Sequence, residues 1–394
     1  MPAIRQHRKL FVASAVLSTA LALNAGNPYI SRVFEYVPAP GQFINTVPEY
    51  SDGDSYADIL NRANEQLCGE ARPGMICLGA FGGYVVFGFD HPVVNVEGEY
   101  DFKIYGNAII SSQEPYGGSC EPGVVWVSAD TNGNGLPDDK WYQLAGSEYS
   151  NPATIHGLRL TYHRPEAGHT PVPDPANKAI TDSRYIRWTS DNPDFAEGYL
   201  QQNMFHRQSY WPEWLEGETL VFEGTLLPPN ATDVSGKGSN WVLCAFGEGY
   251  ADNLPDTEDK GQKIDWAVDE YGNPVRLPAI DFVKVQSGML QNAGWLGETS
   301  TEVCGAEDLH PDAPFNSSLP CSLQADAAAI TVRNGVIQIR LSTAAEVRVS
   351  TVDGRLLYCG LHPEGTSELK PDCPPGCLLI VSAGHVRRKL ITGS

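Results

Sequence analysis

The stretch that decides the fold runs from Glu121 to Tyr149 and reads EPGVVWVSADTNGNGLPDDKWYQLAGSEY. Two apolar, β-prone runs, Val124–Ser128 and Trp141–Leu144, flank a polar loop that is rich in Asn, Asp and Gly. Short apolar runs separated by turn-forming residues predict neighbouring β-strands. The same rhythm continues along most of the chain, so the sequence predicts an all-β protein.

The loop between these two runs carries oxygen-bearing residues in an order that fits a calcium ion. Oxygens fall at its positions 1, 3 and 5, glycine at position 6, a backbone carbonyl at position 7 and a carboxylate at position 9. The predicted ligand set is Asp130, Asn132, Asn134, Leu136, Asp138 and Asp139. Trp141 stands where an EF-hand has its bidentate Glu, so we expect a short calcium loop between two strands. The alternative is an ordinary turn that binds nothing, because the same residues dominate turns.

The N-terminal residues have the pattern of a secretory signal peptide. Basic residues precede the apolar run Leu10–Leu23, and small residues follow, so residues 1–25 are the predicted signal peptide, with cleavage after Ala22 or Ala25. An uncleaved anchor is the weaker alternative, because the apolar run is short for a bilayer span. We therefore expect export through the periplasm to a secreted or cell-surface location, and no membrane span in the mature chain.

The charge of the chain bears on its partners, and its cysteine content bears on disulfides and metal binding. The chain has 27 Lys+Arg against 48 Asp+Glu and a formal charge of −21. Such a surface repels phosphate backbones, so a nucleic-acid partner is not expected.

Nine cysteines in an exported protein predict disulfides with at least one thiol left over. A zinc site at Cys359, Cys373 and Cys377 is the alternative for the C-terminal group.

The chain is predicted to have two β domains. A capping box at Ser55–Asp58, followed by helical spacing of apolar residues up to Gly69, predicts one short helix. Residues 26–312 are the predicted main domain, a calcium-binding jelly roll or β-sandwich that contains this helix. Residues 313–327 have a proline-containing linker composition, and residues 328–394 predict a small immunoglobulin-like β-sandwich.

The segment LGAFGGYVVFGFDHPVVNVEGEYDFKIYGNAI (Leu78–Ile110) resembles a family of exported bacterial cell surface proteins with a jelly-roll domain. VVWVSADTNGNG and Ile280–Val285 match further strands of that family, and Gly294–His310 is similar to the end of the domain in Bacteroidetes members. The resemblance covers roughly Met75–His310. It implies fold and location, and it carries no catalytic residue with it.

The C-terminal module is similar to the sorting domain of type 9 secretion substrates of Bacteroidetes. The matching motifs are Asp353-Gly-Arg-Leu, Gly376–Val381 and Arg388–Ile391, and an insertion at Pro371–Cys377 departs from the pattern. This resemblance implies an outer-membrane secretion or uptake machinery as a possible partner.

An aromatic-rich stretch is the predicted ligand site. Aromatic side chains alternate there with amides and charged groups, which suits flat polar ligands such as sugar rings. The predicted ligand-binding residues are Tyr185, Trp188, Tyr199, Tyr210, Trp211 and Trp214. The alternative is that these rings fill the core beneath a long loop. A later acidic loop, Gly247–Asp269, is weighed as a second cation site, although its spacing is not ordered.

No nucleophile elbow, HExxH, P-loop or dinucleotide motif occurs in the chain. The sequence favours a binding protein over an enzyme: an exported, calcium-stabilised cell-surface protein that captures a glycan or other nutrient. A secreted carbohydrate-active hydrolase is the first alternative, and a structural adhesin or surface-layer component is the second.

Overall fold

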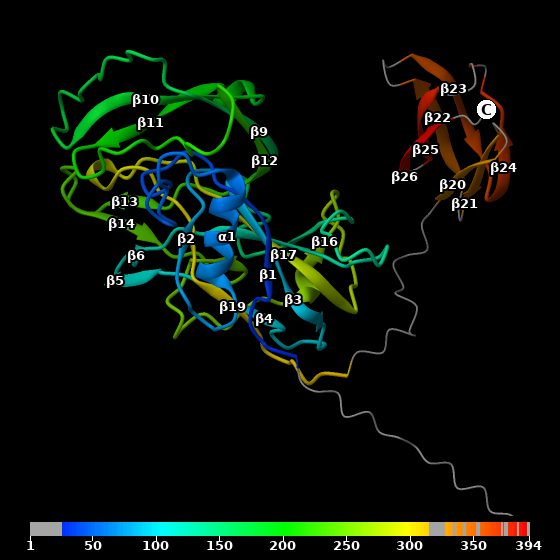
Figure 1. Ribbon diagram of the computed structural model, residues 1–394, viewed down its shortest axis with the longest axis horizontal. Helices are drawn as coiled ribbons and strands as arrows, with labels where there is room; N and C mark the ends of the chain where they lie inside the picture. Colours follow the sequence, from blue (N-terminus) through cyan, green and yellow to red (C-terminus); the bar gives the residue numbers. More distant parts are fainter. Residues whose placement is uncertain are drawn as a thin grey trace, which may run out of the picture.

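The computed structural model describes residues 26–314 and 328–391, the latter with gaps at 334–335, 342–343, 352–354, 372, 374–376 and 384–385. The predicted signal peptide, nearly all of the predicted linker, and Asp353 and Gly376 lie outside these residues. The described chain consists of β-strands with one α-helix, which confirms the predicted all-β class (Figure 1). No helix in this part of the chain is long and apolar enough to span a membrane.

The main sheet has seven antiparallel strands drawn from both ends of the main domain. Their order is β1 (Arg32–Val37), β3 (Tyr84–Val94), β17 (Ala279–Ser287), β7 (Gly123–Ser128), β8 (Tyr142–Leu144) and β16 (Ala267–Val268), with β15 (Tyr250–Ala251) beside β7. The strand β3 runs unbroken from Tyr84 to Val94, past Pro92. A register shift absorbs the residues around Pro92, because Ile280 pairs with Val93 while Phe282 pairs with Gly88.

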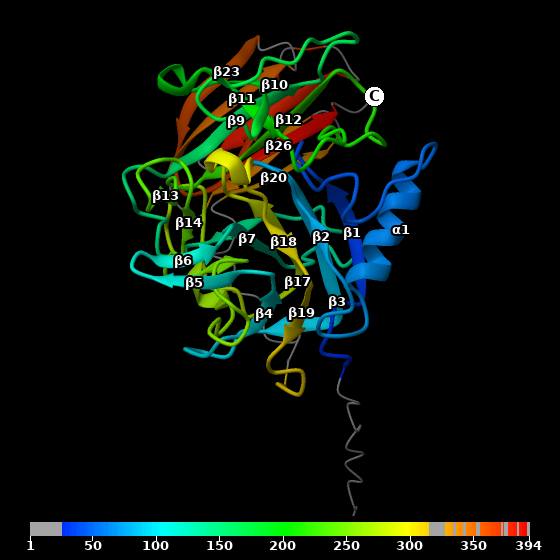
Figure 2. The same ribbon diagram turned by 90° about the vertical axis from the view of Figure 1, so that its left-hand side faces the viewer.

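The helix α1 (Tyr56–Leu67) covers one edge of this sheet and lies beside β1 (Figure 2). The predicted capping box is present: Ser55 Oγ accepts from Asp58 N–H at 3.3 Å, and Asp58 Oδ2 accepts from Ser55 N–H at 2.9 Å. The Asn64 side chain bonds both backbone groups of Val33 in β1, at 2.8 and 3.2 Å. The buried residues of α1, Ile59, Ala63 and Leu67, recur at helical spacing and belong to the main hydrophobic cluster.

The middle of the chain forms a second antiparallel sheet rather than a long loop. Its order is β11 (Glu197–Asn203), β10 (Ile180–Ser190), β9 (Ile155–His163) and β12 (Thr219–Leu226). A separate hydrophobic cluster, which includes Phe81, Leu160, Tyr162 and Phe222, packs against it. Short 3-10 turns occur at η1 (Pro193–Phe195), η2 (Ile264–Trp266) and η3 (Gly294–Leu296).

Smaller antiparallel groups complete the main domain. A third sheet has the order β13 (Ala231–Asp233), β14 (Trp241–Cys244), β6 (Tyr116–Ser119) and β5 (Ile109–Gln113). Two strand pairs follow: β18 (Glu302–Val303) with β2 (Ile76–Cys77), and β19 (Gly305–Asp308) with β4 (Phe102–Tyr105). Segments near residue 300 therefore pair with segments near residues 76 and 104.

The C-terminal module is a sandwich of two antiparallel sheets. One has the order β20 (Ala328–Arg333), β21 (Val336–Leu341) and β24 (Gly365–Leu369). The other has the order β23 (Leu356–His362), β22 (Ala345–Thr351), β25 (Leu378–Ala383) and β26 (Val386–Ile391). Alternate residues such as Ile337, Ile339, Val347 and Val349 are buried and form its own hydrophobic cluster.

Candidate functional site

A row of side chains crosses the main sheet on the face opposite its core. Glu35 pairs with Val86, Val86 with Lys284, and Lys284 with Trp126 in the ladders of β1, β3, β17 and β7. Directly paired residues project to the same side of a sheet, and their chain neighbours project to the other side. The neighbours, such as Val285, lie in the main hydrophobic cluster. Lys284 therefore interrupts an apolar strand on the face that the core does not use.

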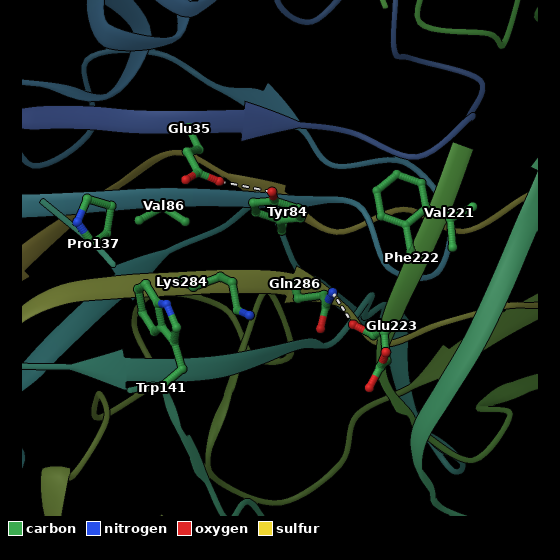
Figure 3. Close-up of a pocket in the computed structure, with 10 residues that line it drawn as sticks. All are labelled: Glu35, Tyr84, Val86, Pro137, Trp141, Val221, Phe222, Glu223, Lys284 and Gln286. Atoms are coloured by element: carbon green, nitrogen blue, oxygen red, sulfur yellow. Dashed lines mark hydrogen bonds between the residues drawn. The ribbon is translucent and has the colours of Figure 1, made fainter. Parts of the chain in front are cut away.

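A pocket of about 220 Å³ opens over this row (Figure 3). Its floor comes from β1, β3 and β17, and one wall comes from β12. Pro137, within the predicted calcium loop, and Trp141, just after it, complete the lining. The lining residues are Glu35, Tyr84, Val86, Pro137, Trp141, Val221, Phe222, Glu223, Lys284 and Gln286. Pockets for drug-sized ligands span roughly 300–1,000 Å³, so this smaller one suits a single ring-sized ligand.

Lys284 is the central polar group of the pocket. Its Nζ lies 4.8 Å from the ring centre of Trp126, 5.4 Å from Trp141 and 5.9 Å from Tyr84. No carboxylate among the described residues lies within ion-pair distance of it. Burial lowers the pKa of Lys284 to about 8, and the nearby charge of Glu35 opposes this shift only in part. The ammonium is thus a desolvated donor without an acidic partner in the described chain.

Glu35 and Gln286 have defined roles at the edges of the pocket. The Tyr84 hydroxyl donates to Glu35 Oε2 at 2.9 Å, and burial, followed by the Glu35 charge, raises the pKa of Tyr84. Gln286 Nε2 donates to the carbonyls of Gly82 and Glu223, at 3.0 and 3.2 Å. A side chain at position 224 would come within 2.3 Å of Gln286 Oε1, so Gly224 permits the close contact of β12 with β17.

The pocket therefore combines three kinds of contact in a small space. Lys284 can donate to a carboxylate or hydroxyl oxygen, and Glu35 and Glu223 can accept from hydroxyl groups. Trp141 and Phe222 offer apolar surface. Together these groups can hold and orient a small polar ring.

The predicted calcium loop lies between β7 and β8, as the sequence indicates. Asp130 Oδ1 accepts from the N–H groups of Gly133 and Asn134, and its Oδ2 accepts from Gly135 N–H at 2.8 Å. The amide groups of Asn132 and Asn134 donate to Asp138, at 2.9 and 3.0 Å. The structure thus brings Asn132, Asn134 and Asp138 together.

The other predicted ligands of this loop have different contacts. Thr131 donates to Asp139 through both its N–H and its hydroxyl. The Leu136 carbonyl accepts from Asp138 N–H at 2.9 Å. A carboxylate that the sequence analysis missed lies at the base of the loop: Asp281 Oδ2 in β17 accepts from Asp130 N–H at 2.7 Å. Burial, followed by the charges of Asp130 and Asp139, raises the pKa of Asp281.

The structure buries four of the six residues of the predicted aromatic ligand platform. Trp188, Tyr210, Trp211 and Trp214 are no more than 6% exposed and pack in two of the hydrophobic clusters of the main domain. The remaining two, Tyr185 and Tyr199, are half-buried, and Tyr185 packs edge-on against Tyr210 at 5.2 Å. The stretch forms β10, β11 and the segment after them, so its rings fill a core between sheets.

The expected disulfides are not found at six of the cysteines. The thiols of Cys68, Cys77, Cys120, Cys244, Cys304 and Cys359 are free. Cys68, at the end of α1, faces Asn64, whereas Cys77 is buried in β2, so these two neighbours in sequence point to different surroundings.

Comparisons with known proteins add little to this site. No protein family matches the chain, and no curated protein matches it. Among solved structures, a beta-glucuronidase of Faecalibacterium prausnitzii aligns at 11% identity with a TM-score of 0.13, over 69% of this chain and 45% of that chain. The chain thus spans less than half the length of that enzyme, and so low a score carries no argument about fold or activity.

Proposed function

We propose that the chain is an exported, calcium-stabilised binding protein that captures a small polar ligand, a sugar or similar nutrient, beside Lys284. The observation that carries this proposal is the partly buried ammonium, which meets three aromatic rings and no carboxylate within ion-pair distance in the described chain. A desolvated cation without an acidic partner is costly, and a ligand oxygen would offset that cost.

The ligand class follows from the rest of the lining. The carboxylates of Glu35 and Glu223 can accept hydrogen bonds from ligand hydroxyl groups, while Trp141 gives a flat apolar surface for a ring face. A sugar-sized ring presents both kinds of surface, and a carboxylate or hydroxyl on it would accept from Lys284. Export is supported by the pattern of residues 1–25, which lie outside the described residues.

The calcium loop is part of the same proposal. Pro137 lies within the loop and Trp141 follows it, and both line the pocket. A calcium ion held by Asp130, Asn132, Asn134, Asp138 and the Leu136 carbonyl would fix the position of that wall. We therefore expect ligand affinity to fall when calcium is removed.

The test is a thermal-shift screen of the full chain against neutral sugars and uronic acids, in calcium and in EDTA. A stabilising sugar that no longer stabilises Lys284→Met, but still stabilises Lys237→Met, supports the pocket; Lys237 is an exposed control. The absence of any stabilising sugar counts against the proposal. Mass spectrometry of the recovered sugar separates binding from hydrolysis, because a binding protein returns it intact.

A further inference from the structure

A second group of carboxylates lies in the main domain and shares no residue with the pocket. Glu121 precedes β7, Asp252 follows β15, and Glu302 begins β18. One carboxylate oxygen from each residue lies within 4.8 Å of the other two. Asp252 is 3% exposed and Glu302 is 4% exposed, so two of the three acids are removed from water.

The backbone holds these three segments tightly together. Asp252 has a φ of 53°, which among the described residues is the one positive φ outside glycine. Asp252 Oδ1 accepts from Asn107 N–H at 2.8 Å, its Oδ2 accepts from Glu302 N–H at 2.9 Å, and its carbonyl accepts from Glu121 N–H at 2.9 Å. A side chain at Gly106 would come within 2.5 Å of Asp252 Oδ1. The cluster is therefore built into the fold rather than gathered by chance on a surface.

The described chain gives these acids no basic partner. None of the three makes an ion pair with Lys, Arg or His, and the nearby Arg72 pairs with Asp256 instead. Burial raises the pKa of Glu121 to about 7. Burial, and then the charges of the other acids, raise the pKa of Asp252 and of Glu302 well above the ordinary range. Three acids in contact, two of them buried, need either shared protons or a cation.

One buried oxygen points to a cation. Glu302 Oε1 is buried and accepts no hydrogen bond from the described residues. The Asn107 side-chain amide lies against the same cluster, 3.1 Å from Asp252 Oδ1 and 3.3 Å from Glu302 Oε2. With its nitrogen toward them the amide donates to both carboxylates, and with its oxygen toward them it adds a ligand for a shared cation. Oxygens that share one calcium ion at about 2.4 Å lie at such separations from one another.

We propose that Glu121, Asp252, Glu302 and Asn107 form a buried site for one hard divalent cation, calcium in an exported protein. All four offer oxygen ligands, which calcium prefers. The cation joins β7, β15 and β18 at their ends, so its role is to lock these segments together. This site is separate from the loop at Asp130–Asp139.

The test measures bound calcium and melting temperature in a chain whose loop is weakened by Asp130→Ala. In that background we expect Glu302→Gln to lose one equivalent of calcium per chain, measured by equilibrium dialysis and elemental analysis. In EDTA the Gln variant is expected to melt at the same temperature as its parent or higher, because one buried acid is gone; in calcium it is expected to melt lower.

Glu298→Gln is the matched control, since Glu298 is also buried but lies outside the cluster, with its Oε2 accepting from Gln42 N–H at 2.8 Å. It is expected to keep the full calcium content. Asn107→Ala retains all three carboxylates and is expected to weaken calcium binding several-fold. An unchanged calcium content in both Glu302→Gln and Asn107→Ala would overturn the proposal, as would binding of zinc without calcium.

Discussion

Lys284 is the residue on which the interpretation of the pocket depends. It sits in the strand IDFVKVQS at a position where apolar residues alternate, and its Nζ lies among three aromatic rings. The sequence holds a weak signal for it, because a lysine inside an apolar strand must either reach water or meet a partner. Only the register of four strands shows that Glu35, Val86 and Trp126 join it in one row.

The buried ammonium predicts a specific dependence of stability on pH. The pKa of Lys284 is about 8 in the folded chain and about 10.4 in an unfolded one, so between these values the unfolded chain binds more protons. The free energy of unfolding contributed by this group therefore rises as pH increases from 8 to 10.5. We expect the free energy of unfolding of Lys284→Met to exceed that of the wild type by roughly 1–3 kcal/mol at pH 7. This difference is expected to disappear near pH 10.5.

Chemical denaturation of both proteins across this pH range measures the difference directly. Lys237→Met controls for the general effect of losing a lysine, because its side chain is exposed. A difference between the wild type and Lys284→Met that stays constant with pH would show that the ammonium is not desolvated.

The burial of the aromatic stretch gives a second prediction at this scale. Trp211 is 1% exposed in its hydrophobic cluster, so Trp211→Ala should cost roughly 3–5 kcal/mol of unfolding free energy. Trp141 is half-buried at the pocket, so Trp141→Ala should cost only about 1 kcal/mol while weakening ligand binding. Equal losses of stability in urea denaturation would contradict this division between core and pocket.

At the scale of elements, local patterns predicted local structure well. The capping box at Ser55 led to the correct helix, and the apolar run Val124–Ser128 led to the correct strand β7. The sequence left open whether the aromatic stretch binds a ligand or fills a core, because a core ring and a binding ring have the same sequence pattern and only packing against a second sheet separates them. Asp252 lies in the acidic loop Gly247–Asp269 that the sequence analysis weighed as a second cation site, but Glu121 and Glu302 were missed, because they lie far from it in the chain and meet it only in the fold.

The loop Asp130–Asp139 is predicted to stabilise the fold when it binds calcium. In a Glu302→Gln background, 10 mM calcium should stabilise the fold by about 1.4–2.7 kcal/mol, the value expected for a dissociation constant of about 10⁻⁴ to 10⁻³ M. Asp130→Ala should remove most of that gain, because Asp130 is the first ligand of the loop. The exposed Asp52→Ala serves as control. A melting temperature indifferent to calcium in this background would exclude the loop as a calcium site.

At the scale of the whole molecule, the hydrophobic clusters divide between two parts of the chain. Three clusters draw on residues from Ile30 to Ala306, and one draws on residues from Ile330 to Ala383. No described cluster mixes the two sets. Since buried apolar contacts dominate stability, each part is expected to fold on its own.

A shortened chain tests this expectation. A protein that ends at Asp312 should unfold in calorimetry at the same temperature as the main transition of the full chain, with the transition of the C-terminal module missing. A drop in the main transition of several degrees would mean that the C-terminal module stabilises the main domain.

The central claim is that the pocket at Lys284 binds a small polar ring, and fluorescence titration tests it most directly. The rings of Trp126 and Trp141 lie 4.8 and 5.4 Å from Lys284 Nζ, so a ligand there must change their emission. Titration of the calcium-loaded full chain with a panel of neutral sugars and uronic acids should give a saturable change for at least one. That change should be lost in Lys284→Met and kept in Lys237→Met. Equal binding by the wild type and Lys284→Met, or no response to any sugar of the panel, would contradict the claim.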